Sequence, residues 1–150
     1  MPLARIANDG QLRCMSITVT TQRHGHVTEI SFTRPPLNFA SPELLSQIAD
    51  ALDAIDAAPQ IRCSVLAADG KAFCAGADLA ATVDAEGSAD LGDVLERTFN
   101  PLIRRIRGLR MPVVCAVNGV AAGAGANLAL ACDIVPVSYT HLTLPTKRIV

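Results

Sequence analysis

Two short loops built largely of glycine and alanine are the segments of this sequence best suited to chemistry. The first spans residues 70–79 (GKAFCAGADL), and the second spans residues 118–128 (NGVAAGAGANL). Small side chains let a ligand approach the backbone closely, and unpaired backbone N–H groups can stabilise a negatively charged oxygen. Either loop alone is better explained by close packing of a helix on a strand. Two such loops in one chain could supply two donors that hold a single carbonyl oxygen.

Each loop follows an apolar run that is typical of a buried strand. These runs are residues 63–68 and 113–117. Turns are expected directly after them, and a helix should begin within residues 123–127. Residues 72–79 are predicted to be a loop of small residues without a strand of its own.

The rest of the chain predicts a hairpin and two further helices. Alternation of Ile and Val with Ser and Thr predicts strands at residues 16–22 and 27–33, joined by a turn at 23–26. Ser41-Pro42-Glu43 is a typical helix start. The apolar residues that follow at helical spacing are Leu44, Leu45, Ile48, Leu52 and Ile55. A second helical period comprises Leu91, Val94, Leu95, Phe99, Leu102, Ile103 and Ile106, with a kink or restart expected at Pro101.

The resulting order of elements, β-β-α-β-α-β-α, predicts an α/β fold. From about Ser16 to Val135 the chain also resembles the enoyl-CoA hydratase/isomerase (crotonase) superfamily. Residues 73–79 (FCAGADL) match the first signature loop of that family. The second is matched by residues 112–119 (PVVCAVNG) together with Ala121, Gly123 and Cys132 to Ile134. The resemblance implies a crotonase-like spiral of ββα turns, truncated in this chain.

The resemblance also implies roles for individual residues. The N–H groups of Ala77 and Ala124 would be the two oxyanion donors that stabilise the enolate of a coenzyme A thioester. The carbonyl of Ala75 would contact the adenine amino group, and Arg34-Pro35 with Asn38 matches a segment near which the family binds coenzyme A. The other substrate-binding residues would be Gly76, Asp78, Leu79, Gly123 and Asn127.

The same resemblance implies an acyl-CoA substrate and no separate cofactor. It further implies that the full-length form assembles as a homotrimer or a dimer of trimers. Asp78 could in principle act as a base, although its place in the family's loop favours a structural or pocket role.

One position departs from the hydratases of the family. They carry a glutamate where this chain has Asn127, and asparagine cannot act as a general base. Isomerase chemistry is therefore favoured, and residues 99–105 (FNPLIRR) with 119–125 (GVAAGAG) look most like isomerases of ring-epoxide phenylacetyl-CoA. In those enzymes the catalytic carboxylate lies beyond the position of Val135, so we expect none in this chain. An acyl-CoA-binding module and an inactive fragment are the alternatives.

Composition argues against several other classes of protein. Half of the 150 residues are hydrophobic and the net charge is −1, which suits one globular domain rather than a disordered or nucleic-acid-binding chain. The five cysteines lack C-x-x-C spacing and nearby histidines, so we expect no metal site. Their odd number and the lack of a secretory apolar segment at the N-terminus favour a reducing, cytoplasmic location. The uncharged stretch from Met111 to Cys132 is long enough for a membrane span. Its glycines and asparagines favour a buried strand, turn and helix instead.

Three further features carry weaker hypotheses. Gly123-Ala-Gly125 resembles part of a dinucleotide fingerprint, but Leu128 stands where the third glycine is required. His24 and His26 fall in the predicted hairpin turn and are expected to be solvated. Four arginines are expected on a solvated helix face, with attraction of coenzyme A phosphates as the alternative: Arg104, Arg105, Arg107 and Arg110.

Both ends of the chain differ in pattern from its centre. Residues 1–14 are expected to be an N-terminal extension, and residues 15–135 the N-terminal part of the crotonase core. Residues 136–150 (PVSYTHLTLPTKRIV) are expected to be a non-native tail, because they resemble translated read-through of a sequencing adapter. A genuine strand and turn is the alternative for this segment.

Overall fold

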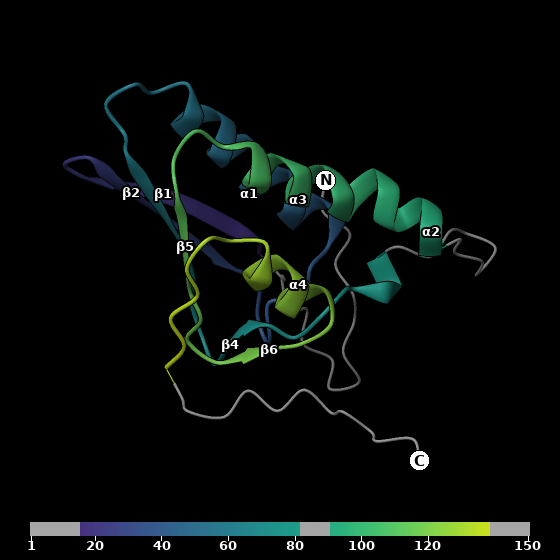
Figure 1. Cartoon of the computed structure of the whole chain (residues 1–150). Coiled ribbons are helices and arrows are strands. Elements are labelled where there is room, and N and C mark those ends of the chain that lie inside the picture. Colours follow the sequence, from purple (N-terminus) through teal and green to yellow (C-terminus); the bar gives the residue numbers. More distant parts are fainter. Residues whose placement is uncertain (1–15, 82–90, 139–150) are drawn as a thin grey trace, which may run out of the picture.

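The computed structural model describes residues 16–81 and 91–138, without the side chains of Leu79 and Leu91. The predicted extension at residues 1–14 and the tail beyond Ser138 lie outside these ranges. The strands are β1 (Thr18–His24), β2 (Val27–Thr33), β3 (Cys63–Ala68), β4 (Ala72–Cys74), β5 (Val113–Ala116) and β6 (Val120–Ala121). The α-helices are α1 (Pro42–Asp56), α2 (Leu91–Val94), α3 (Asn100–Gly108) and α4 (Ala124–Leu130), as Figure 1 shows. The mixed α/β class predicted from the sequence is confirmed.

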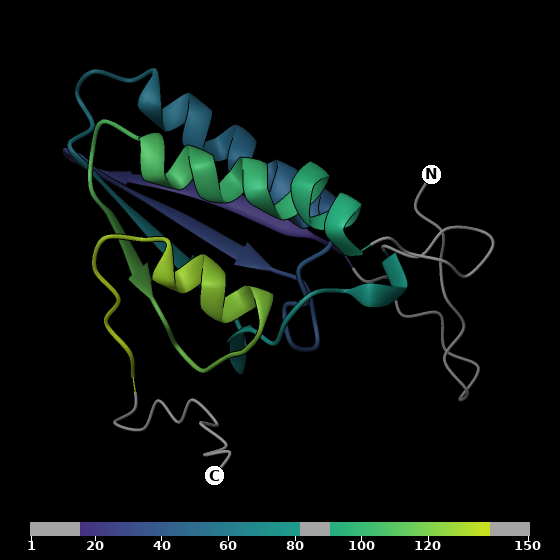
Figure 2. The ribbon, with the colours of Figure 1, turned by 45° about the vertical axis from the view of Figure 1, so that its right-hand side comes forward.

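A four-stranded sheet in the order β1-β2-β3-β5 forms the body of the molecule. The hairpin β1-β2 is antiparallel, whereas β3 pairs in parallel with both β2 and β5. The predicted turn at residues 23–26 is too long, because Arg23 and His24 continue the ladder and Gly25 and His26 alone connect the strands. The helices cover one face of this sheet, with α1 and α3 lying alongside each other (Figure 2).

Helix α1 supplies five buried side chains to the apolar layer above the sheet. Its first turn is capped by Ser41, whose Oγ accepts a hydrogen bond from the Leu44 N–H at 3.3 Å. The five apolar residues expected at helical spacing are all buried and join one core with Ile30, Phe32 and Leu66 of the sheet. Burial of this apolar stripe is what holds the helix against the sheet.

A π-helical turn, η2 (Leu95–Phe99), connects α2 to α3 just before Pro101, where a kink or restart was expected. The N–H of Asn100 donates to the carbonyl of Leu95, five residues earlier. Proline has no N–H and crowds the carbonyl four residues before it, so a wider turn at this point relieves the clash. The helix neither breaks nor restarts at Pro101, because residues 91–108 are continuously helical, and the irregularity is a π turn just before the proline.

Three of the four clustered arginines of α3 and the segment after it are paired with carboxylates. Arg104 contacts Glu96, Arg105 contacts Asp53, and Arg110 contacts Asp56 at 3.5 Å. Arg110 also donates to carbonyl groups at the end of α1 and in the loop that follows it. The side chains of Arg104, Arg105 and Arg110 are exposed, which agrees with the expectation of a solvated helix face, and the ion pairs are an addition to it.

Two short strands were not expected from the sequence. Residues 72–79 were predicted to be a loop, but their first three residues form β4, which pairs in parallel with β6. Phe73 of β4 is completely buried, and its ring meets that of Phe32 edge-on at 5.3 Å between centroids. This packing fixes β4 against the main sheet.

The uncharged stretch from Met111 to Cys132 is divided into β5, β6 and α4. Within the two described ranges, none of the helices has the length and apolar character needed to cross a membrane. After α4 the chain returns along β5, where Val114 bridges Ile134 and Val117 bridges Val137. The second pairing is made by main-chain groups, including the Val117 N–H, which donates to the Pro136 carbonyl at 2.9 Å.

Ser64 provides a test of how the centre of the sheet is packed. Its side chain is fully buried, and its hydroxyl has no hydrogen-bond partner among the described residues. Burying an unpaired hydroxyl costs free energy, so Ser64→Ala is expected to leave the free energy of unfolding unchanged or raise it by about 1 kcal/mol. Urea denaturation followed by circular dichroism measures this change.

Ser41→Ala is the matched control, because it removes a hydroxyl that has a partner. Loss of this N-cap is expected to lower the free energy of unfolding by about 1 kcal/mol. Equal destabilisation by the two substitutions would contradict the packing described for Ser64.

Candidate functional site

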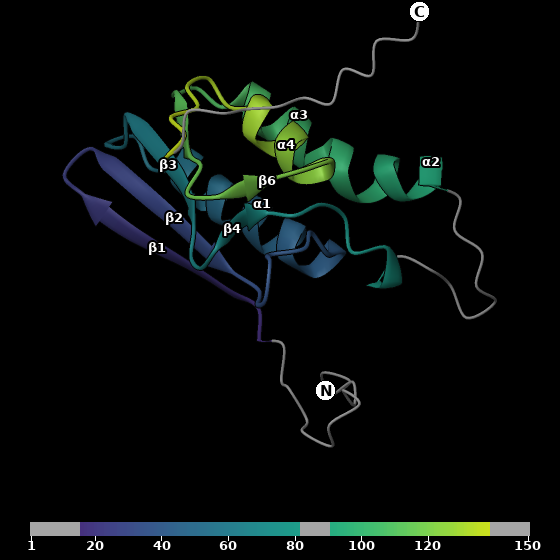
Figure 3. The same ribbon diagram turned by 90° about the horizontal axis from the view of Figure 1, so that it is seen from below.

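The two glycine- and alanine-rich loops leave the same end of the small parallel sheet. Strands β4 and β6 lie side by side (Figure 3). Ala72 pairs with Val120, and Cys74 pairs with Ala121. The carboxyl ends of parallel strands lie at one edge, so the segments after β4 and β6 emerge side by side. Ala77 and Ala124 come equally far along the chain after the paired Cys74 and Ala121. The sheet therefore brings together the two predicted donor segments.

The backbone of Ala77 is held by a bridge to Ala40. The Ala40 N–H donates to the Gly76 carbonyl at 2.8 Å, and the Asp78 N–H donates to the Ala40 carbonyl at 2.9 Å. Neighbouring residues of an extended chain direct their backbone groups to opposite sides, so the Ala77 N–H points away from Ala40. No acceptor for it is found in the described part of the chain.

Gly76 turns the backbone so that the Ala77 N–H faces β6 and α4. The Cys74 carbonyl still faces that side, where it accepts from the Ala122 N–H at 3.0 Å. In a regular strand the Ala75 N–H and the Gly76 carbonyl would face opposite sides. Here both face the segment from Leu37 to Ala40, because Gly76 has a φ of 128°. This backbone conformation is strained for residues with a side chain, which explains glycine at this position.

Ala124 is the first residue of α4, so its N–H has no acceptor within the helix. Gly123, which precedes the helix, has a φ of 52° and a ψ of −119°. Residues 16–81 and 91–138 contain no hydrogen-bond acceptor for the Ala124 N–H. Two unpaired backbone donors thus follow two neighbouring strands.

The loops approach each other closely enough that side chains are excluded between them. A Cβ atom on Gly125 would lie 2.1 Å from the carbonyl oxygen of Cys74. A Cβ atom on Gly119 would lie 2.3 Å from the carbonyl oxygen of Lys71. Both distances are far below a van der Waals contact, so glycine is required at both positions for β4 to lie against β6 and α4.

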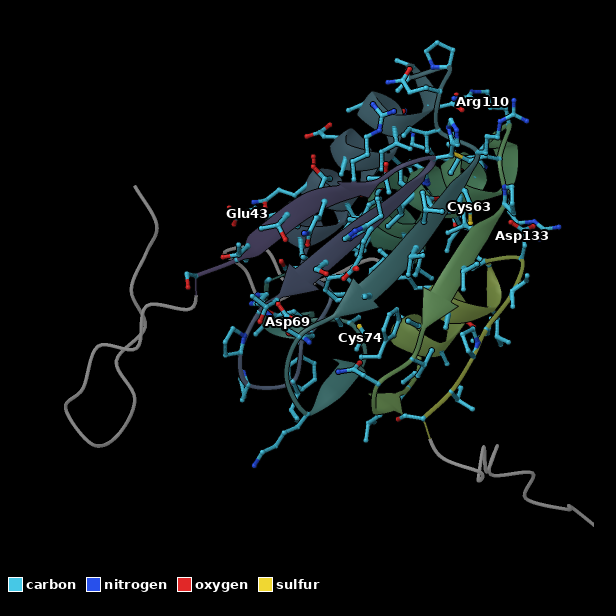
Figure 4. The ribbon with its side chains drawn as sticks, turned by 90° about the vertical axis from the view of Figure 1, so that its left-hand side faces the viewer. Glu43, Cys63, Asp69, Cys74, Arg110 and Asp133 are labelled. Atoms are coloured by element: carbon cyan, nitrogen blue, oxygen red, sulfur yellow. The ribbon has the colours of Figure 1, made fainter. Side chains whose placement is uncertain are left out.

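The segment from Arg34 to Ala40 supports the first loop from its other edge. Asn38 is buried and has a φ of 54°. Its Oδ1 accepts from the Arg34 N–H at 2.6 Å, and its Nδ2 donates to the carbonyls of Asp69 and Ala72, each at 2.8 Å. The buried amide thereby joins this segment to the chain entering β4. Figure 4 shows Asp69 and Cys74 at this end of the sheet, with Cys63 and Arg110 at the other.

Asp78 forms an ion pair with Arg34, which the sequence alone did not reveal. The guanidinium contacts Asp78 Oδ2, and Asp78 Oδ1 accepts from the Ala81 N–H at 3.2 Å. Both oxygens of this carboxylate are therefore engaged. Arg34 was expected only within a segment resembling a coenzyme A-binding region, because nothing local in the sequence links it to a residue so far along the chain.

The remaining predicted site residues lie on the same two loops. The Ala75 N–H donates to the Leu37 carbonyl at 3.1 Å. Leu79 begins the short 3-10 helix η1 (Leu79–Ala81). Asn127 lies in α4 with an exposed side chain, and its N–H donates to the Gly123 carbonyl at 3.1 Å. The predicted residues are thus gathered at one end of the molecule.

Two of the buried cysteines, Cys74 and Cys115, are poorly suited to nucleophilic chemistry. Burial raises the pKa of the Cys74 thiol, which also contacts the Gly76 carbonyl. Contact with the Cys132 thiol, together with burial, raises the pKa of Cys115. A neutral thiol is a weak nucleophile. Among the described residues, no group of three or more His, Cys, Asp or Glu side chains is placed to hold a metal ion.

Comparison with known proteins gives a consistent family. A sequence model described as enoyl-CoA hydratase/isomerase matches residues 22–141. The 1,2-epoxyphenylacetyl-CoA isomerase of Escherichia coli K12 is 49% identical over 112 residues, which are 73% of this chain and 43% of that protein. The mevalonyl-coenzyme A hydratase of Beauveria bassiana is 42% identical over 134 residues, which are 83% of this chain and 47% of that protein.

Solved structures show the same relationship. The enoyl-CoA hydratase of Mycobacterium smegmatis superposes with a TM-score of 0.71 and is 31% identical, over 79% of this chain and 47% of that chain. The chain described here therefore spans less than half the length of these three relatives.

The contact between Gly125 and Cys74 can be tested by substitution. In Gly125→Ala the new methyl group would overlap the Cys74 carbonyl and push α4 away from β4. We expect the free energy of unfolding to fall by about 3 kcal/mol, the upper end of the usual cost of overpacking. Urea denaturation measures the loss.

Gly108→Ala is the matched control, because a Cβ atom on Gly108 meets nothing within 4 Å. This residue is the last of α3, and alanine loses less backbone entropy than glycine on entering a helix. The control should therefore be neutral or stabilising, and a similar loss in both variants would argue against a specific contact at Gly125.

Proposed function

Because the chain belongs to the enoyl-CoA hydratase/isomerase (crotonase) family, we propose that it holds the thioester carbonyl of an acyl-CoA in a backbone oxyanion hole. The observation that carries the proposal is that the N–H groups of Ala77 and Ala124 both lack a hydrogen-bond acceptor among the described residues. They follow two strands that are paired in parallel, and both lie where side chains are small.

The proposed chemistry begins with removal of a proton from the carbon next to the thioester carbonyl. The electron pair of that C–H bond forms a C=C bond, and the carbonyl oxygen becomes the negatively charged oxygen of an enolate. Donors aimed at this oxygen stabilise the charge by about 3–4 kcal/mol each. Return of a proton to a different carbon completes an isomerisation without any separate cofactor.

The rest of the pocket follows from the same two loops. The Ala75 carbonyl is proposed to accept from the adenine amino group of coenzyme A. Gly76, Asp78 and Leu79 would shape the first loop, while Gly123 and Asn127 would border the acyl group from the second. The small side chains along both segments support a close approach of the ligand to the backbone.

Isomerisation is favoured over hydration as the reaction of the whole protein. Asn127 cannot serve as the base that a hydratase needs at this position. An isomerase of 1,2-epoxyphenylacetyl-CoA is 49% identical to this chain. A related compound, an aryl- or acyl-CoA able to form an enolate, is therefore the proposed substrate class.

Binding of acyl-CoA without turnover is the second candidate function. The ion pair of Asp78 favours this function for the 150-residue chain by itself. Asp78 is the carboxylate next to the first donor, and both of its oxygens are engaged by Arg34 and the Ala81 N–H. Neither oxygen of this carboxylate is therefore left without a partner inside the protein. The proton-moving group is accordingly proposed to lie outside the residues described.

The oxyanion assignment can be tested with an acyl-CoA carrying ¹³C at the thioester carbonyl. Hydrogen bonds from both loops should lower the C=O stretching frequency of the bound thioester relative to the free one. Ala124→Pro removes one N–H at a helix position where proline is tolerated, and about half of the lowering should be lost. Isotope-edited infrared spectroscopy measures the frequency.

Ala124→Gly is the control for this experiment, because it removes a methyl group but keeps the N–H. It should retain the full lowering. An unchanged frequency in Ala124→Pro would exclude Ala124 as a donor, and the absence of any lowering in the parent chain would contradict the oxyanion hole itself.

The separation of carbonyl binding from proton transfer gives another expectation. The purified 150-residue chain should bind acyl-CoA but should not convert enoyl-CoA substrates, because its nearby carboxylate is held by Arg34. A spectrophotometric assay, with a full-length enoyl-CoA hydratase as the positive control, measures turnover. Clear activity of the chain would show that it contains its own proton-transferring group.

A further inference from the structure

We propose that Arg34 and Asp78 are positioning residues whose ion pair aims the Ala77 N–H at the bound carbonyl. This inference rests on the proposed oxyanion function and adds a role that does not involve contact with the substrate. It also predicts different effects on the two N–H donors, because the ion pair supports the loop of Ala77 and not the loop of Ala124.

The first step is the geometry around Ala77. Its N–H is directed by the bridge in which Ala40 bonds to the residues on either side, Gly76 and Asp78. A shift of Ala40 relative to Asp78 would rotate the peptide group between Gly76 and Ala77. The Ala77 N–H would then turn away from the bound carbonyl. The direction of the Ala77 N–H therefore depends on how firmly these two segments are held together.

The second step is that Arg34 grips both segments. Its Nη1 donates to the carbonyl of Phe39 at 3.1 Å, next to Ala40, while its Nη2 contacts the carboxylate of Asp78. One rigid guanidinium thus connects the residue before Ala40 to the residue after Ala77. Lysine has no such planar fork, so arginine is suited to this bridging role.

The third step is that Arg34 is itself anchored. Its N–H donates to Asn38 Oδ1, and its carbonyl accepts from the Asn38 N–H at 2.9 Å. Asn38 in turn binds the carbonyls of Asp69 and Ala72 at the entrance to β4. The ion pair therefore extends a connected set of hydrogen bonds that begins on the sheet.

The environment of the pair makes it more than an ordinary surface contact. The side chains of Arg34 and Asp78 are 10% and 18% exposed, whereas the other arginine–carboxylate pairs in the described part are at least 39% exposed. Water therefore screens this pair less than those pairs. A charge-assisted hydrogen bond is roughly twice as strong as a neutral one, so a neutral substitution should loosen the first loop.

The test uses the ¹⁵N-labelled 150-residue chain and crotonyl-CoA as the probe. In the parent chain, binding should move the amide proton resonances of both Ala77 and Ala124 downfield. In Asp78→Asn the shift at Ala77 should fall to about half or less, while the shift at Ala124 is retained. Ala124 thereby serves as an internal reference that a general loss of structure would also affect.

Three further variants sharpen the result. Arg34→Gln should give the same selective loss, and the double variant should lose no more than Arg34→Gln alone, because Asp78 acts only through its ion pair with Arg34. Arg34→Lys keeps a positive charge beside Asp78 and should retain part of the Ala77 shift even where a neutral variant folds poorly. Asp69→Asn, at an exposed carboxylate on the same end of the sheet, should change neither shift.

The outcomes distinguish the two proposals. No downfield shift at either alanine in the parent chain would contradict the oxyanion hole. Normal shifts in the parent chain with an unchanged Ala77 shift in both neutral variants would overturn the positioning role alone. Equal losses at Ala77 and Ala124 would also overturn it, because they would indicate a structural effect on the whole site.

Discussion

The direct contact between the backbones of two very short strands is the constraint on which the candidate site depends. β4 and β6 pair in parallel, and α4 begins so close to Cys74 that only glycine fits at position 125. With a side chain at that position, the second loop could not lie beside the first. The other edge of the first loop is held by Ala40 and by the ion pair between Arg34 and Asp78. The donor at Ala77 is thus fixed from both sides by residues distant in sequence.

Local patterns in the sequence predicted the larger elements well. Strands β2 and β3 have the predicted limits, and α1 begins at Pro42 after its serine cap. These elements bury alternating or helically spaced apolar residues, so their pattern reflects their burial directly. The two glycine- and alanine-rich segments were also recognised as neighbours, through their order and their likeness to a family.

The connections within the candidate site were beyond local patterns. β4 and β6 are two or three residues long, and small residues give them no alternation that would mark a strand. The partnership of Arg34 with Asp78 joins positions that only the folded chain brings together. No motif predicted the positive φ of Asn38 or the three hydrogen bonds of its side chain. The domain limits at residues 1–14 and 136–150 remain predictions.

The π turn before Pro101 has a consequence for how the long helix presents its faces. Leu95, Phe99, Leu102 and Ile106 would form a single row on a regular α-helix, because they are spaced by four, three and four residues. Phe99, Leu102 and Ile106 are buried, but Leu95 is 38% exposed. One extra residue in the turn rotates the preceding helix by about 100°. The helix therefore continues through the π turn, but the apolar face of its first turns is rotated relative to that of α3. Leu95, which the apolar spacing predicts to be buried, is exposed to solvent as a result.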